Sequence, residues 1–151
     1  MKIFRFGHEM GKTISRFDSN FVMSRILSCD KPAHIGCMHL EPNGIIGFHE
    51  ASCPQLLLVV NGQGWVRCDS DEMVPVAIGD AVFWEQGEWH ETRTDTGLTA
   101  MVVESDVPRS STIHAATEIS SSGIKCGSPG VIKFVSTCRA KELLLASQMA
   151  S

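Results

Sequence analysis

The stretch GFHEASCPQLLLVVNGQGW, residues 47–65, combines a histidine, a glutamine and an Asn-Gly pair with a run of apolar residues. The run QLLLVV predicts a buried strand over residues 55–60, because it is short, apolar and bounded by turn residues. Asn61-Gly62 lies between two apolar segments and predicts a tight hairpin, since both residues accept positive φ. The stretch therefore indicates two antiparallel strands joined by a short turn.

Similar short apolar runs continue on both sides of this stretch. Separators such as Asp95-Thr96-Gly97 are typical of β-turns, and no helical period is visible between the runs. The fold class is therefore predicted to be all-β, an antiparallel sandwich or barrel. The predicted strands lie at residues 21–27, 33–40, 45–50, 55–60, 64–68, 74–78, 81–84, 90–93 and 98–104.

The length of 151 residues fits a single domain with one core. We expect a β-barrel domain over residues 1–118, followed by a linker and tail over residues 119–151, where the sequence becomes small and polar. The segment CRAKELLLASQMA in this tail contains strong helix formers and could form a short C-terminal helix.

Charge and terminal sequence narrow the classes of partner. Lys and Arg total 13 against 17 Asp and Glu, a formal net charge of −4, and the basic residues are scattered. This composition argues against a nucleic acid or an anionic membrane surface as partner. The first residues lack the apolar run of a secretion signal, and no segment approaches the length of a membrane span. We therefore expect a cytoplasmic protein.

Six cysteines are present, and none forms a Cys-x-x-Cys pair. In a cytoplasmic chain they are expected to be reduced thiols with a mostly structural role. Cys53 differs from the others because it lies inside the opening stretch.

A second segment, GDAVFWEQGEWHE at residues 79–91, places His90 at the start of a later strand. Alternate residues of an extended strand share a face, so His49 and Gln55 would face the same side if the chain between them stayed extended. Two imidazoles and an amide oxygen converging from separate strands would provide three ligands of a divalent metal site.

Together the two segments resemble the motifs of the cupin superfamily, Gly-x5-His-x-His-x3,4-Glu-x6-Gly and Gly-x5-Pro-x-Gly-x2-His. The resemblance covers about residues 21–104. It implies a small jelly-roll β-barrel that commonly forms homodimers and has its site inside the barrel mouth. The first motif aligns with Asn43/Gly44, His49, Ala51, Gln55 and Gly62, and the second with Gly79, Glu85, Gly87 and His90.

The sequence departs from the usual four metal ligands of the family at two positions. Ala51 replaces the second histidine, and Gln55 replaces the glutamate. The resemblance thus implies a metal site of His49, Gln55 and His90, holding iron, manganese, nickel or zinc. Without a carboxylate and with one imidazole fewer, its metal affinity should fall.

Further residues near the two motifs are candidates for the site. Glu85 stands where the family usually has proline, and if buried near His90 it could act as a general base. Glu50 could supply a carboxylate if it turned inward. The three tryptophans would either pack in the core and rim or form an aromatic wall for a small ligand. The candidate ligand-binding residues are Glu50, Trp65, Trp84 and Trp89.

Three functions remain open at this stage. The first is a metal-dependent dioxygenase, isomerase or epimerase acting on a small molecule. The second is a metal-free barrel that binds or senses a small ligand without catalysis. The third is metal-free acid–base catalysis by His90 with Glu85. The first is favoured slightly, because polar side chains remain at three of the four ligand positions, where a site abandoned for packing would have become apolar.

Overall fold

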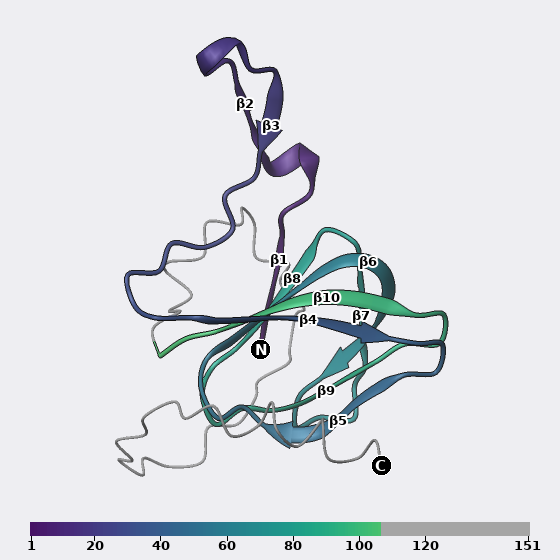
Figure 1. Cartoon of the computed structure of the whole chain (residues 1–151). Coiled ribbons are helices and arrows are strands. Elements are labelled where there is room, and N and C mark those ends of the chain that lie inside the picture. The colour runs from purple at the N-terminus through teal and green to yellow at the C-terminus, as the bar shows by residue number, and fades with distance from the viewer. Residues whose placement is uncertain (107–151) are drawn as a thin grey trace, which may run out of the picture.

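The computed structural model describes residues 1–106, and the predicted linker, tail and C-terminal helix beyond residue 118 lie outside this range. Within it, eight strands form the body and two form a separate hairpin (Figure 1). The strands of the body are β1 (Lys2–Arg5), β4 (His34–Leu40), β5 (Ile45–Glu50), β6 (Gln55–Arg67), β7 (Val74–Ala77), β8 (Asp80–Trp84), β9 (Trp89–Arg93) and β10 (Leu98–Glu104).

The body consists of two antiparallel layers that share β6. The first layer has the order β1-β8-β6-β10-β4, and in the second layer β6 pairs with β7 and β9, and β9 pairs with β5. Antiparallel layers that face each other bury the inward side of each strand between them. The predicted all-β jelly-roll barrel is thus confirmed.

The main apolar core lies between the two layers. It contains ten buried residues, which include Leu57 and Val59 of β6, Val82 and Trp84 of β8, and Ala100 of β10. Burying one leucine or valine side chain of this core stabilises the fold by about 1.5–3 kcal/mol. This core closes one part of the barrel and leaves the cavity described below in the other.

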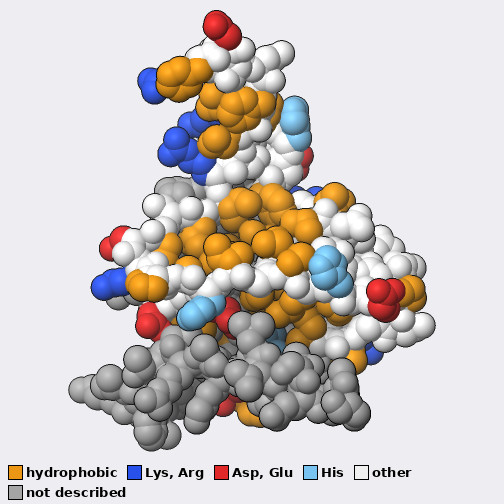
Figure 2. Space-filling view, viewed as in Figure 1, with side chains coloured by type: hydrophobic (Ala, Val, Ile, Leu, Met, Phe, Trp, Pro, Cys, Tyr) orange, Lys and Arg blue, Asp and Glu red, His pale blue; other side chains and the backbone are white. Residues whose placement is uncertain are grey.

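A second apolar cluster lies on the outer face of the first layer. Leu56 and Phe83 are completely or almost completely buried there, and Ile26, Leu27 and Met101 pack against the cluster. Figure 2 shows apolar side chains gathered directly below the hairpin, and the residues of this cluster come from β1, β6, β8 and β10. The first layer is therefore apolar on both faces.

The N-terminal region differs from the sequence expectation. β1 was not among the predicted strands, and it pairs with β8 in the first layer. The predicted strand at residues 21–27 is shorter, and its paired part forms a hairpin that stands away from the barrel (Figure 1). The hairpin and the two short 3-10 helices around it comprise η1 (His8–Met10), β2 (Lys12–Ile14), η2 (Arg16–Asp18) and β3 (Phe21–Met23).

The prediction of a hairpin at Asn61-Gly62 is wrong, because β6 runs through this pair without turning back. Gly62 has φ +77°, and the register with β10 shifts by one residue at Val60, two residues before Gly62, which is a β-bulge. The bulge bends β6, so its first half pairs in one layer and its second half in the other. The corner between the layers therefore lies at residues 60–62, which contain both the bulge and the positive φ of Gly62.

Gly62→Ala is expected to lower the free energy of unfolding by about 2 kcal/mol. A Cβ at this position would meet the backbone oxygen of Gly97, and the left-handed backbone adds strain for any residue with a side chain. Urea denaturation followed by fluorescence measures the change. Gly47→Ala is the control, because a Cβ there meets nothing within 4 Å. An equal decrease in the free energy of unfolding in the two variants would contradict the requirement for glycine at position 62.

Two further observations concern the sequence expectations. Cys68 is disulfide-bonded, so the expectation of reduced thiols is wrong for this residue, whereas Cys29 and Cys37 are free and exposed. No helix among residues 1–106 is long and apolar enough to cross a membrane.

Candidate functional site

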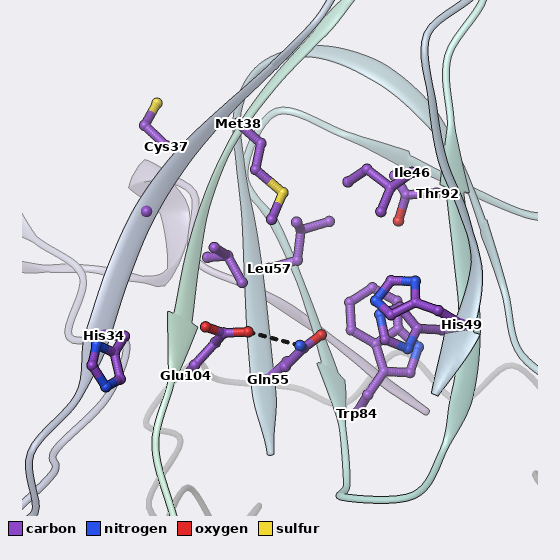
Figure 3. A pocket seen from close by; sticks show the side chains of 13 residues that line it. His34, Cys37, Met38, Ile46, His49, Gln55, Leu57, Trp84, Thr92 and Glu104 are labelled. Atoms are coloured by element: carbon purple, nitrogen blue, oxygen red, sulfur yellow. Dashed lines mark hydrogen bonds between the residues drawn. The ribbon is translucent and has the colours of Figure 1, made fainter. Parts of the chain in front are cut away.

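Two histidines meet inside the barrel because their strands pair in register. His49 on β5 lies directly opposite His90 on β9, and the centroids of their rings are 4.3 Å apart. The ring of His90 also stacks on Trp84 of β8 at 4.3 Å with an interplanar angle of 23°. Three residues from both motif segments therefore form one aromatic cluster (Figure 3).

Backbone carbonyls fix the tautomer of both imidazoles. The Nδ1 of His49 is 2.7 Å from the oxygen of Gly47, and the Nδ1 of His90 is 3.3 Å from the oxygen of Glu88. A carbonyl oxygen only accepts hydrogen bonds, so each Nδ1 carries a proton and donates it. Each Nε2 of a neutral ring then has a lone pair for a ligand.

His90 is uncharged at neutral pH. Its side chain is buried, and burial is the main reason that its pKa falls from 6.5 to about 4. The neighbouring His49 lowers the pKa further, the N-terminal amine also lowers it, and the hydrogen bond to the Glu88 carbonyl opposes these effects. His90 therefore enters the site as a hydrogen-bond acceptor or metal ligand.

A polar pair faces the histidines from the first layer. Gln55 on β6 and Glu104 on β10 are register partners, and the amide Nε2 of Gln55 donates to Oε1 of Glu104 over 2.8 Å. This bond directs the amide oxygen of Gln55 toward the side of Trp84 and His49 (Figure 3). His34 of β4 lies opposite Glu104 in the register.

These groups line a cavity of about 280 Å³. Its apolar wall includes Met38, Ile46, Leu57 and Val102. Figure 3 shows the polar side chains around it. They are His34, His49, Gln55, His90, Thr92 and Glu104.

Two buried polar atoms in the cavity lining have no hydrogen-bond partner in the described part of the chain. They are Oγ1 of Thr92 and Nε1 of Trp84, and both side chains are 1% exposed. An unpaired buried polar group destabilises a protein by about 1–3 kcal/mol. Such groups beside a cavity are those that a bound molecule would satisfy.

The structure brings together some of the predicted site residues and separates others. His49, Gln55, His90 and Trp84 line the cavity. Trp65 is half-buried, whereas Glu50, Glu85 and Trp89 are exposed, and all four lie outside the lining. Glu50 alternates away from His49 on β5, and Glu85 follows the end of β8 in the turn before β9.

Sequence reasoning missed Glu104 and Thr92. The signal was available, because inward residues alternate along a strand. Glu104 has the same parity as the buried Ala100 and Val102 on β10, and Thr92 has the same parity as His90 on β9. Glu104 is the carboxylate of this cavity.

A metal fits this donor set poorly. Residues 1–106 contain no group of three His, Cys, Asp or Glu side chains placed to hold a metal ion. The third possible ligand beside the two imidazoles is the amide oxygen of Gln55, because the amide nitrogen donates a hydrogen bond to Glu104. Transition metals in proteins usually have at least three imidazole, thiolate or carboxylate ligands.

Comparison with known proteins gives structural neighbours only. No family model matches the chain, and no curated protein matches it. A cupin superfamily protein from Desulfitobacterium hafniense is 13% identical, with 51% of this chain and 69% of that chain covered at a TM-score of 0.45. A cupin-2 domain protein from Shewanella frigidimarina is 15% identical, with 53% of this chain and 76% of that chain covered at a TM-score of 0.44.

A protein from Thermotoga maritima described as a predicted oxalate decarboxylase is 25% identical, with 46% of this chain and 62% of that chain covered and a TM-score of 0.42. The strands form two layers that share β6, and residues of both motifs line the cavity between the layers. By these features, the chain has the jelly-roll barrel fold of the cupin superfamily.

Proposed function

We propose that this protein is a cupin barrel that binds a small molecule in the cavity without a resident metal. The observation that carries the proposal is the set of unpaired polar groups beside the cavity. Thr92 Oγ1 and Trp84 Nε1 are buried and have no hydrogen-bond partner among residues 1–106, and both residues line the same cavity as His49 and His90. Desolvated polar groups of this kind favour a ligand that supplies the missing hydrogen bonds.

Each part of the cavity has a distinct role in this binding. The rings of Trp84, His90 and His49 pack together and form an aromatic wall of the cavity. The Nε2 atoms of the two histidines and the amide oxygen of Gln55 accept hydrogen bonds, and Thr92 can donate or accept. The volume of about 280 Å³ limits the ligand to a small molecule.

The alternative is a divalent transition metal, favoured by one observation. The carbonyls of Gly47 and Glu88 orient both imidazoles, which is how metal-binding histidines are usually held. His49, His90 and the amide oxygen of Gln55 would bind iron, manganese, nickel or zinc. The metal would act as a Lewis acid in an oxygenase or isomerase reaction.

Elemental analysis of the purified full-length protein separates the two functions. It is done on the protein as isolated and after incubation with excess iron, manganese, nickel or zinc, followed by desalting. We expect substoichiometric metal, at the same level in the wild type, His49→Ala and His90→Ala. Near-stoichiometric metal that disappears in both variants would overturn the metal-free proposal.

Two further sequence expectations stay predictions. The homodimer is implied by the cupin resemblance, and the structure describes a single chain. The cytoplasmic location rests on the sequence alone. The hairpin that stands away from the barrel carries exposed apolar side chains, and a second copy is a natural partner for such a surface.

A further inference from the structure

We propose that the cavity selects a small planar cation, such as an amidinium or a protonated nitrogen base, through the carboxylate of Glu104. The proposal rests on the proposed function and names the class of ligand. It follows from the charges around the cavity, the free oxygen of Glu104 and the aromatic side chains opposite it.

The first step concerns charge. Glu104 is the one carboxylate in the cavity lining, and the described lining contains neither lysine nor arginine. No ion pair within residues 1–106 involves Glu104. A carboxylate in a partly enclosed site without a cationic partner favours a bound cation and disfavours a bound anion.

The second step concerns the arginines of the barrel strands, none of which lines the cavity. Arg67 donates to Glu91 over 2.8 Å, and Arg5 pairs with Asp80 at 3.0 Å. Both acids are buried residues outside the cavity lining. These two guanidinium groups have partners other than Glu104, and the third arginine, Arg93, is exposed on β9. The charge of Glu104 therefore remains for a ligand.

The third step concerns hydrogen bonding. Gln55 occupies Oε1 of Glu104, and Oε2 has no hydrogen-bond partner among residues 1–106. The amide oxygen of Gln55 points from the same place toward Trp84 (Figure 3). A planar ligand with two N–H donors could therefore give one hydrogen bond to the carboxylate and one to the amide oxygen.

The fourth step concerns the rest of the ligand. The rings of Trp84, His90 and His49 pack together in the cavity lining, and the planar part of a ligand can pack against this aromatic wall. Thr92 Oγ1, buried and unpaired, lies toward the histidines in Figure 3 and would bind a further polar atom. The cavity thus combines acceptors at one end with an aromatic wall at the other.

Three probes of nearly equal shape test the proposal by isothermal titration calorimetry on the full-length protein. Benzamidine is a planar cation, benzamide is its neutral counterpart and benzoate is the anion. We expect benzamidine to bind at least about tenfold more tightly than benzamide, and benzoate to bind most weakly. Equal binding of all three probes, a preference for benzoate, or binding of none would overturn the cation proposal.

Glu104→Gln provides the matched variant. The amide oxygen that replaces the carboxylate oxygen can still accept from Gln55, so the fold is expected to persist. We expect benzamidine affinity to fall about tenfold or more and benzamide affinity to stay within about twofold. Glu41→Gln, an exposed acid outside the cavity lining, should leave both affinities unchanged. If Glu41→Gln weakened benzamidine as much as Glu104→Gln, the protein's overall charge would be responsible and the proposal would fail.

The outcomes also separate this inference from the proposed function. Equal binding of the three probes, lost together in Trp84→Phe, would leave a ligand-binding cavity without selection for cations. Near-stoichiometric metal in the elemental analysis would instead remove the metal-free function, whichever probe bound best.

Discussion

Replacing Trp84 with alanine is expected to lower the free energy of unfolding by about 3–5 kcal/mol. Trp84 is 1% exposed and belongs to the core between the two layers. Its indole stacks on His90, so truncation removes apolar contacts and leaves a cavity that the rigid sheet cannot close. Urea denaturation followed by circular dichroism measures this loss.

Trp89→Ala is the matched control for this variant. Trp89 is 41% exposed, and its ring contacts Phe48 at a centroid distance of 5.4 Å. Its truncation is expected to destabilise the protein by about 1 kcal/mol or less. A similar decrease in the free energy of unfolding in the two variants would contradict the larger contribution of Trp84 to the stability of the barrel.

The second prediction is that acidification destabilises the protein through His90. Its pKa is about 4 in the folded protein and 6.5 in the unfolded chain, chiefly because of burial. Above about pH 6.5 the residue is neutral in both states and contributes no pH dependence. Between pH 6.5 and about 4 the unfolded chain binds a proton that the folded protein does not, so stability falls as the pH falls.

The size of this effect follows from the two pKa values. The difference between 6.5 and about 4 corresponds to about 3 kcal/mol, which is lost across that pH window. We would measure urea unfolding from about pH 8 to about pH 4, with a metal chelator present, in the wild type and in His90→Gln. The difference between the two curves isolates His90 from the carboxylates that titrate in the same range.

A second variant tests the physical cause. His49 lowers the pKa of His90 by charge repulsion, so His49→Ala should raise that pKa and narrow the pH window. Parallel loss of stability in the wild type and His90→Gln would contradict the assignment of the pH dependence to His90.

The sequence predicted strand positions well where turn residues and apolar alternation agreed. The segments at 45–50 and 98–104 correspond to β5 and β10, and the segments at 33–40 and 74–78 correspond closely to β4 and β7. These signals are local, because a pleated strand alternates its faces and a β-turn needs residues with special φ. The motif spacing likewise identified His49, Gln55 and His90 as residues of one cavity.

Local signals were insufficient at Asn61-Gly62. A positive φ at Gly62 serves a hairpin and a bulge equally well, and the sequence alone favoured the hairpin. The pairing of β6 with four other strands decides between them, since those strands hold both of its halves in place. The N-terminal strand β1 was missed for a related reason, because its partner β8 lies far away in the sequence.

The sequence by itself determined the all-β class, most strand positions and the three motif residues that face the cavity. It did so because alternation, turn chemistry and motif spacing are encoded within a few residues of one another. Only the tertiary structure decided that Glu104 is the carboxylate beside Gln55, that Glu85 lies outside, and that Thr92 and Trp84 have unpaired polar atoms. These properties depend on register and burial between distant strands, which no single stretch of the chain specifies.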